Sequence, residues 1–190
     1  MAKRSLNNEE IYEAAEAVLL QEGYKAFHFK LLADRLQVGR STIYEYFTNK
    51  EELVTSYMVH KMSRFYEEIK SINVHGHASK RLEEIIRLLM KFTQIHLIIE
   101  TTPHVNADIS EKVKKNLMML WRARNDIFQL IETAIVEGQE AGEIKQELPA
   151  TMITDLIFNA VRLNQRYYDH PLEVGTLLYH VIFNGIGTEK

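Results

Sequence analysis

The chain has 190 residues, a formal net charge of −3 and no cysteine, and 46% of its residues are hydrophobic. A chain of this length can bury a real core as one or two domains. The lack of cysteine excludes disulfides and thiolate metal sites and agrees with a cytoplasmic location. No apolar run reaches the roughly 18–20 residues that span a bilayer, so we expect no membrane partner.

The first 36 residues predict two helices. Asn7 and Glu10 have the spacing of a capping box at the start of the first helix, and Gly23 sits where that helix should end. Four apolar residues then follow at i, i+3, i+4 and i+7, the spacing of one buried helix face. These residues are Phe29, Leu32, Ala33 and Leu36.

A sharp turn and a third, shorter helix follow directly. Residues 37–39 interrupt the apolar pattern, and Gly39 supplies backbone freedom for the turn. In residues 40–47, Ile43 and Phe47 can pack inward, which leaves the polar side chains to face elsewhere. Two helices joined by so short a turn predict a helix-turn-helix, whose second helix enters the major groove of DNA.

The stretch LADRLQVGRSTIYEYFTNKEEL, residues 32–53, resembles the TetR family of bacterial transcriptional regulators. The shared positions are Ala33, Val38, Thr42, Ile43, Tyr44, Tyr46, Phe47, Lys50 and Leu53. The chain departs from the family pattern at Gln37 and Ser41, which are usually Gly, and at Gly39, which is usually a Ser-type cap. The motif covers about the first quarter of the chain, and the departures leave the base preference open.

The DNA-binding prediction rests on this motif and not on charge. Residues 1–50 hold seven basic and seven acidic side chains, a balance of zero. Arg40 is the candidate for a bidentate guanine contact. Lys50 lies in the first turn of the next helix, where the positive helix end already attracts anions such as phosphate. The candidate DNA-binding residues are Lys25, Lys30, Arg40, Ser41, Thr42, Tyr44, Tyr46 and Lys50.

The remaining chain reads as a run of helices. We expect a long helix that begins within residues 48–52 and runs to about 72, one over 79–100 stopped by Pro103, a short one over 106–115, one over 116–140, one opened by Pro149, and a last one over 172–186. The predicted fold is all-α with about nine helices. A three-helix DNA-binding head, residues 1–50, is joined by the long helix to a helical bundle, residues 51–190.

The last helix is apolar almost all round, so both of its sides must be covered. One side can face its own domain and the other a second copy of the chain. The family resemblance implies the same arrangement, a homodimer interface built from the last two helices of each protomer. The alternative is that a loop or the 79–100 helix covers the second side. The candidate interface residues are Leu156, Ala160, Leu177, Val181 and Phe183.

The resemblance also implies a ligand pocket among the helices of residues 79–142. Aromatic and methionine side chains with a few polar groups suit an apolar or amphipathic small-molecule effector, whose identity the sequence does not give. The candidate lining residues are Phe92, His96, Met118, Trp121, Arg122, Asn125 and Phe128. Trp121 and Phe128 of this set are expected to face inward. The same is expected of Arg124, which lies between them in the sequence.

No catalytic motif is visible, so we do not expect an enzyme or a cofactor. His75 and His77 lack acidic or thiol ligands at metal spacing, so no metal site is expected either. The sequence therefore predicts a ligand-responsive, sequence-specific DNA-binding repressor that binds a palindromic operator as a dimer. The alternative is an all-helical small-molecule-binding or scaffold module without specific DNA binding, which the neutral head, Gln37 and Glu45 favour.

Overall fold

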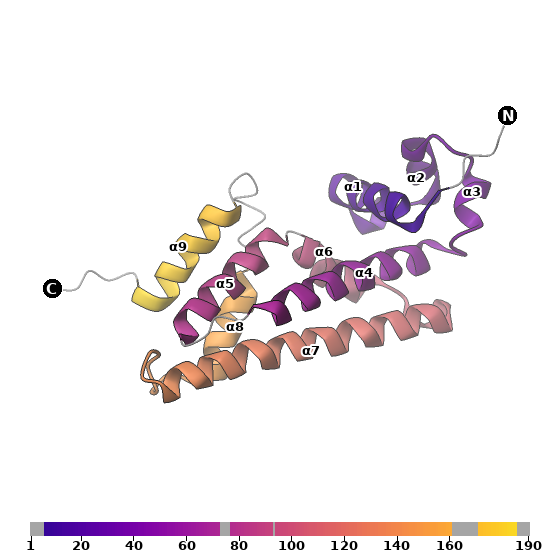
Figure 1. Ribbon diagram of the computed structural model, residues 1–190. Helices are drawn as coiled ribbons and strands as arrows, with labels where there is room; N and C mark the ends of the chain where they lie inside the picture. Colours follow the sequence, from indigo (N-terminus) through magenta and orange to yellow (C-terminus); the bar gives the residue numbers. More distant parts are fainter. Residues whose placement is uncertain (1–5, 73–76, 93, 161–170, 186–190) are drawn as a thin grey trace. The chain divides into compact units, whose positions relative to one another are not determined.

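The computed structural model (Figure 1) describes residues 6–72, 77–92, 94–160 and 171–185. All regular structure in these residues is helical, which confirms the all-α prediction. The chain divides into two compact units, the first made of residues 1–62 and 97–121 and the second of residues 63–96 and 122–190. Three helices, α4, α6 and α7, contribute residues to both units.

The α-helices are α1 (Asn8–Ala26), α2 (Phe29–Leu36), α3 (Arg40–Tyr44), α4 (Lys50–Ser71), α5 (Ala78–Lys91), α6 (Gln94–Thr101), α7 (Glu111–Glu140), α8 (Ala150–Ala160) and α9 (Pro171–Asn184). Two 3-10 turns, Thr102–His104 and Ala107–Ile109, precede α7. None of the helices in the described ranges is both long enough and apolar enough to cross a membrane.

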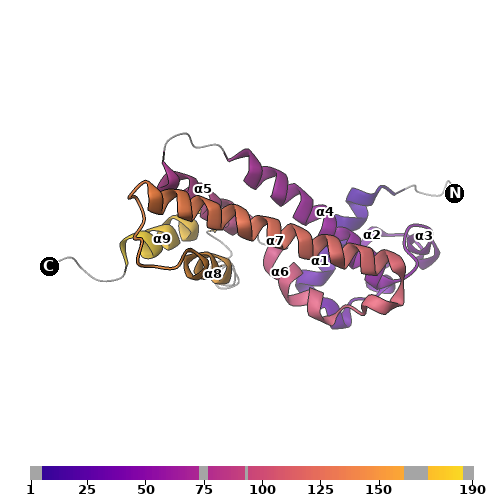
Figure 2. The ribbon, with the colours of Figure 1, turned by 90° about the horizontal axis from the view of Figure 1, so that it is seen from below.

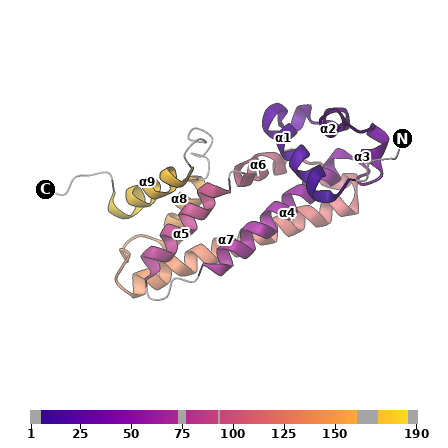
Figure 3. The same cartoon turned by 45° about the horizontal axis from the view of Figure 1, so that its top comes forward.

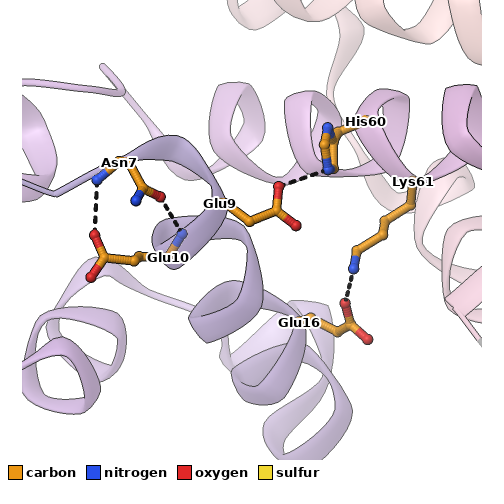
Figure 4. Close-up of polar contacts among 6 residues, drawn as sticks. All are labelled: Asn7, Glu9, Glu10, Glu16, His60 and Lys61. Carbon is orange, nitrogen blue, oxygen red and sulfur yellow. Dashed lines mark hydrogen bonds and ion pairs between the residues drawn. The ribbon is translucent and has the colours of Figure 1, made fainter.

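In the first unit, two side-chain pairs join α1 to α4: Glu9 with His60, and Glu16 with Lys61 (Figure 4). The predicted capping box is present: the Asn7 side chain accepts from the Glu10 amide at 2.8 Å, and the Glu10 carboxylate accepts from the Asn7 amide at 3.0 Å. Glu16 lies 2.9 Å from Lys61 of α4, and both side chains are largely buried. These contacts set the side of α1 that faces α4.

The core of the head consists of the apolar stripes that the sequence predicts. The buried side chains come from α1, α2, α3 and the segment after α3. They are Ile11, Ala14, Ala15, Val18, Leu19, Phe29, Leu32, Ala33, Leu36, Ile43 and Phe47. Gly23 leaves the helical region with φ 73°, but α1 only kinks there and ends at Ala26, so the predicted helix end at Gly23 is wrong.

In the second unit, α5 and α9 lie side by side (Figures 1 and 3). Gly175 of α9 permits this approach, because a Cβ at this position would lie 3.2 Å from the Cα of Arg87. The α5 helix therefore covers one side of α9, the side that was expected to face its own domain. The other side of α9 stays open, and Leu177 is 64% exposed there.

Two helix boundaries differ from the sequence prediction. The helix expected over 79–100 is broken, because Phe92 has φ −85° and ψ 72° and packs its ring edge-on against Phe65, with centroids 5.2 Å apart. The break expected between residues 115 and 116 is absent, and α7 runs without interruption for 30 residues (Figure 2). No Pro or Gly occurs before Gly138 to interrupt it.

The turn between α2 and α3 holds a non-glycine residue in the left-handed region. Gln37 has φ 55° and ψ 42°, and its amide donates to the Asp34 carbonyl at 3.2 Å. The next amide, of Val38, donates to the Ala33 carbonyl at 3.0 Å. The family pattern has Gly at this position because Gly adopts positive φ without steric cost.

We predict that Gln37→Gly increases the free energy of unfolding by roughly 0.5–1 kcal/mol, since it removes left-handed strain from an exposed turn. Gln129→Gly, at an exposed interior position of α7, is the matched control and should lower the same quantity by about 1 kcal/mol. Urea unfolding followed by circular dichroism measures both. A loss of stability in Gln37→Gly would contradict the strain argument.

Candidate nucleic-acid interface

The α3 helix is shorter than predicted, with five residues, but its buried side is the predicted one. Ile43 is fully buried and Phe47, just beyond the helix, is almost so. Their burial turns Arg40, Ser41 and Tyr44 outward, where all three are exposed. The Tyr44 ring packs edge-on against Phe29 with centroids 5.0 Å apart, so its position is fixed although half of it is exposed.

Two of the candidate DNA contacts lie differently from the expectation. Thr42 is only 8% exposed and faces the head core beside Ile43. The Tyr46 hydroxyl donates to the Leu6 carbonyl at 2.7 Å and accepts from the Leu6 amide at 3.1 Å. Because its one hydrogen is already donated, Tyr46 anchors the start of the chain instead of offering a donor to phosphate.

Three cationic side chains of the head line one surface hollow. This hollow has a volume of about 450 Å³ and contains Lys30, Arg40 and Lys50 in its lining. His28, Phe29, Tyr44, Thr48 and Asn49 complete the lining, which has no acidic residue. A head with no net charge thus still has a face suited to an anion such as the DNA backbone.

Two helix N-termini border the same hollow. His28 caps α2 by accepting from the Leu31 amide at 3.4 Å, and Asn49 caps α4 by accepting from the Glu52 amide at 2.8 Å. The positive ends of both helices therefore add to the attraction for anions. The His28 cap was not predicted from the sequence. A polar residue directly before an apolar helical stripe was the signal for it.

Lys50 is held in place by the residue Tyr24. Its Nζ atom donates to the Tyr24 carbonyl at 3.4 Å and lies 4.6 Å from the centroid of the Tyr24 ring. The Tyr24 hydroxyl donates to Glu51 at 3.3 Å. Burial, together with the charge and hydrogen bond of Glu51, raises the pKa of Tyr24 to about 12, so the ring stays neutral and keeps this bond at physiological pH. Lys25 is exposed in the last turn of α1.

The candidate effector residues do not form one cluster. Met118 and Trp121 belong to the first unit and are exposed, Trp121 by 65%. Arg122 and Arg124 are also exposed. The inward prediction for Trp121 and Arg124 is therefore wrong. The buried stripe of α7 passes through Leu120 and Ile127, and Trp121 lies about 100° around the helix from Leu120.

Two of the predicted aromatic residues do have aromatic partners in the second unit. Phe128 of α7 stacks on Phe158 of α8 with centroids 5.5 Å apart, and Phe92 packs on Phe65. Asn125 is half-buried, and the side chain of His96 lies outside the described part of the chain. Arg124 extends over the Phe158 ring at 5.9 Å, which places a cation at the edge of this aromatic cluster.

A groove of about 720 Å³ runs between α8 and α9. Its lining includes the predicted interface residues Leu156, Ala160, Val181 and Phe183, with Met152 and Ile182 beside them. Leu156 and Val181 are exposed, whereas Ala160 is buried. The apolar surface of the last two helices thus remains open in a single chain.

No group of three or more potential metal ligands occurs among the described residues. His75 lies outside them, and His77 is 3.4 Å from Glu143.

The helix-turn-helix, its cationic hollow and the helical second unit define the class of a DNA-binding protein with an appended helical domain. Residues 11–57 match the sequence model described as bacterial regulatory proteins, tetR family. The matched residues lie in the head, which therefore has the DNA-binding domain of the TetR family of transcriptional regulators.

Similar proteins cover most of the chain. The fatty acid metabolism regulator protein of Bacillus subtilis (strain 168) is 25% identical over 158 residues, which are 80% of this chain and 78% of that protein. The crystal structure of FadR from Bacillus subtilis in complex with stearoyl-CoA has a TM-score of 0.68 and 22% identity, covering 95% of this chain and 100% of FadR. AibR in complex with isovaleryl coenzyme A and operator DNA has a TM-score of 0.74 and 15% identity, with 93% and 97% covered.

The matched head and the similar regulators bear on the two functional alternatives. This chain is a ligand-responsive DNA-binding transcriptional regulator and not an enzyme, as the sequence predicted. These comparisons favour the regulator over the scaffold alternative without specific DNA binding. The individual DNA-contacting residues stay predictions.

We predict different effects for the two central cations of the hollow. Arg40→Ala should cost about 1–3 kcal/mol of specific binding and relax the preference at one base pair. Lys50→Ala should weaken binding to all DNA and reduce the slope of log affinity against log salt by about 1. Fluorescence anisotropy over a salt series measures both effects. The control is Lys80→Ala, which removes an exposed cation of α5. Equal losses on specific and random DNA for Arg40→Ala would contradict base reading.

Proposed function

We propose that this protein is a homodimeric repressor whose operator affinity falls when it binds a fatty acyl-CoA. The observation that carries the DNA-binding part is the hollow in which Lys30, Arg40 and Lys50 meet beside the exposed face of α3. Residues 1–50 would form the DNA-binding domain, and residues 51–190 would bind the effector and dimerise. A regulator of transcription of this kind acts in the cytoplasm.

The open apolar surface of α8 and α9 supports the homodimer. Leu156 is 55% exposed and Leu177 64%, and both lie on helices whose other sides are buried in the second unit. Covering such side chains with a second copy is the usual way to remove them from water. A twofold dimer would place two α3 helices for successive major grooves about 34–36 Å apart, which requires a palindromic operator.

The similar proteins suggest the chemistry of the effector. One is named for fatty acid metabolism, one was solved with stearoyl-CoA, and one with isovaleryl coenzyme A and operator DNA. An acyl-CoA joins an apolar chain to anionic phosphates, so it is amphipathic as the sequence predicted for the effector. The aromatic cluster of Phe128 and Phe158 and the exposed cations Arg122 and Arg124 are the groups we propose to meet these two parts.

We predict that stearoyl-CoA lowers the operator affinity of the wild-type chain about 5–150-fold, the usual range for coupled sites. The operator is first obtained by selecting bound genomic fragments and sequencing them for a shared palindrome. Free coenzyme A and stearate are the controls, since each carries only one part of the ligand. If stearoyl-CoA binds tightly and leaves operator affinity unchanged, acyl-CoA is not the effector.

We predict that Leu177→Glu disrupts the dimer, because it places an unpaired carboxylate in a buried interface at a cost of about 3–5 kcal/mol. Sedimentation velocity should show monomer, and operator binding should be lost with it. Val136→Glu, an exposed apolar position on α7, is the matched control and should leave the dimer intact. An unaltered dimer in Leu177→Glu would place the interface elsewhere.

A further inference from the structure

The first two turns of α7 belong to the same unit as the DNA-binding head, and they are buried on one side. Val113 is fully buried, Asn116 is 9% exposed and Leu120 is also buried. A buried asparagine on an otherwise apolar stripe needs partners for its amide, because an unsatisfied donor is costly. These partners all lie on α4, directly after the DNA-reading helix.

One polar tie joins the N-termini of α7 and α4. The Ser110 hydroxyl oxygen accepts from the Val113 amide at 3.2 Å and so caps α7, and the same hydroxyl is hydrogen-bonded to the Glu52 carboxylate. Glu52 in turn accepts from the Thr48 hydroxyl at 2.7 Å. Burial opposes the charge of Glu52, but the bonds from Thr48 and Ser110 and the charge of Lys112 outweigh it and lower its pKa. The carboxylate is therefore ionised at neutral pH.

A cation of α7 extends the same tie toward the end of the helix-turn-helix. The Nζ atom of Lys112 lies 5.1 Å from the ring centroid of Phe47, within the range of a cation–π contact. Phe47 is the buried residue that closes the segment after α3, and its amide still donates to the Ile43 carbonyl at 3.1 Å.

A second tie lies one and a half turns further along α7. The Asn116 Nδ2 atom donates to the Thr55 hydroxyl at 3.0 Å and to the Ser56 hydroxyl at 3.2 Å. Thr55 uses its own hydrogen to donate to the Glu51 carbonyl at 2.7 Å, and Ser56 is hydrogen-bonded to Tyr12 of α1. Asn116 therefore uses both of its N–H donors. It connects α7 directly with α4 and, through Ser56, with α1.

We infer that Ser110 and Asn116 are positioning residues for DNA recognition, which hold α3 in its reading position through Glu52, Thr48, Thr55 and Ser56. A helix as short as α3 takes its position from its neighbours. The element that follows α3 in the chain is the start of α4. The hydrogen bonds of Ser110 and Asn116 hold this start of α4 against α7. The inference rests on the proposed role of α3 as the helix that reads DNA.

The test compares specific with non-specific affinity. Asn116→Leu keeps the branched shape of the side chain and removes both donors, so it should lower operator affinity about tenfold while affinity for random DNA changes less than about twofold and the salt slope is unchanged. Ser110→Ala should also lower operator affinity. Ser110→Thr, which keeps the hydroxyl and the cap, should bind the operator like the wild type.

A variant with a purely structural effect provides the comparison. Ile131→Val, at a fully buried position of the second unit, lowers stability without touching either tie. Well below the melting temperature it should not change the ratio of specific to random binding. If Asn116→Leu behaves like Ile131→Val, with a lower melting temperature and an unchanged ratio, the inference is overturned.

A second measurement separates this inference from the proposed function. Amide hydrogen exchange of residues 40–53 should be at least about tenfold faster in Asn116→Leu and in Ser110→Ala than in the wild type or Ile131→Val. If the wild-type chain selects no operator, the proposed function fails, and the exchange result alone decides whether α7 holds this segment. Exchange rates equal to those of the wild type would overturn the inference in either case.

Discussion

The burial of Ile43 and Phe47 beneath α3, the helix that we propose to read DNA, is the interaction on which our account of the head depends. A helix of five residues has too few hydrogen bonds to be stable by itself in water. Its orientation is therefore set by what its apolar side meets, and this burial is what turns Arg40, Ser41 and Tyr44 outward. Every DNA contact that we assign to α3 requires these two side chains to stay inside.

The neighbouring helices secure that burial from three directions. The ring of Tyr12 on α1 lies 6.1 Å from that of Phe47, the Phe29 ring of α2 meets Tyr44, and Lys112 of α7 lies over Phe47. The caps of α2 and α4 then place two positive helix ends beside the same surface. This explains how a head with equal numbers of acidic and basic groups can present a cationic face, because position and not total charge decides what a phosphate meets.

The sequence predicted what local chemistry determines. The capping box at Asn7 and the stripe from Phe29 to Leu36 depend on residues close in the chain, and both are confirmed, whereas α1 only kinks at Gly23 and runs on to Ala26. The sequence did not predict that Tyr46 would bind the Leu6 backbone, since forty residues separate them. It also placed Trp121 inside, because periodicity shows that a helix has an apolar side but not where the edge of that side falls.

The second unit was harder to predict for the same reason. Phe92 ends α5 through its packing on Phe65, a contact between helices that no local signal announces. The continuity of α7, by contrast, is consistent with its composition. The prediction missed it by placing a break between residues 115 and 116. The open surface of α8 and α9 was anticipated from the apolar character of the last helix, although the close approach of α5 at Gly175 was not.

The most direct test of the central claim is methylation protection of guanine N7, which reports only on the major groove, with the wild-type chain on its selected DNA. The outward face of α3 predicts protected guanines in two successive major grooves, about 10–10.5 base pairs apart from centre to centre. Binding that leaves guanine N7 unprotected throughout the site would contradict the assignment of α3 as the helix that reads DNA.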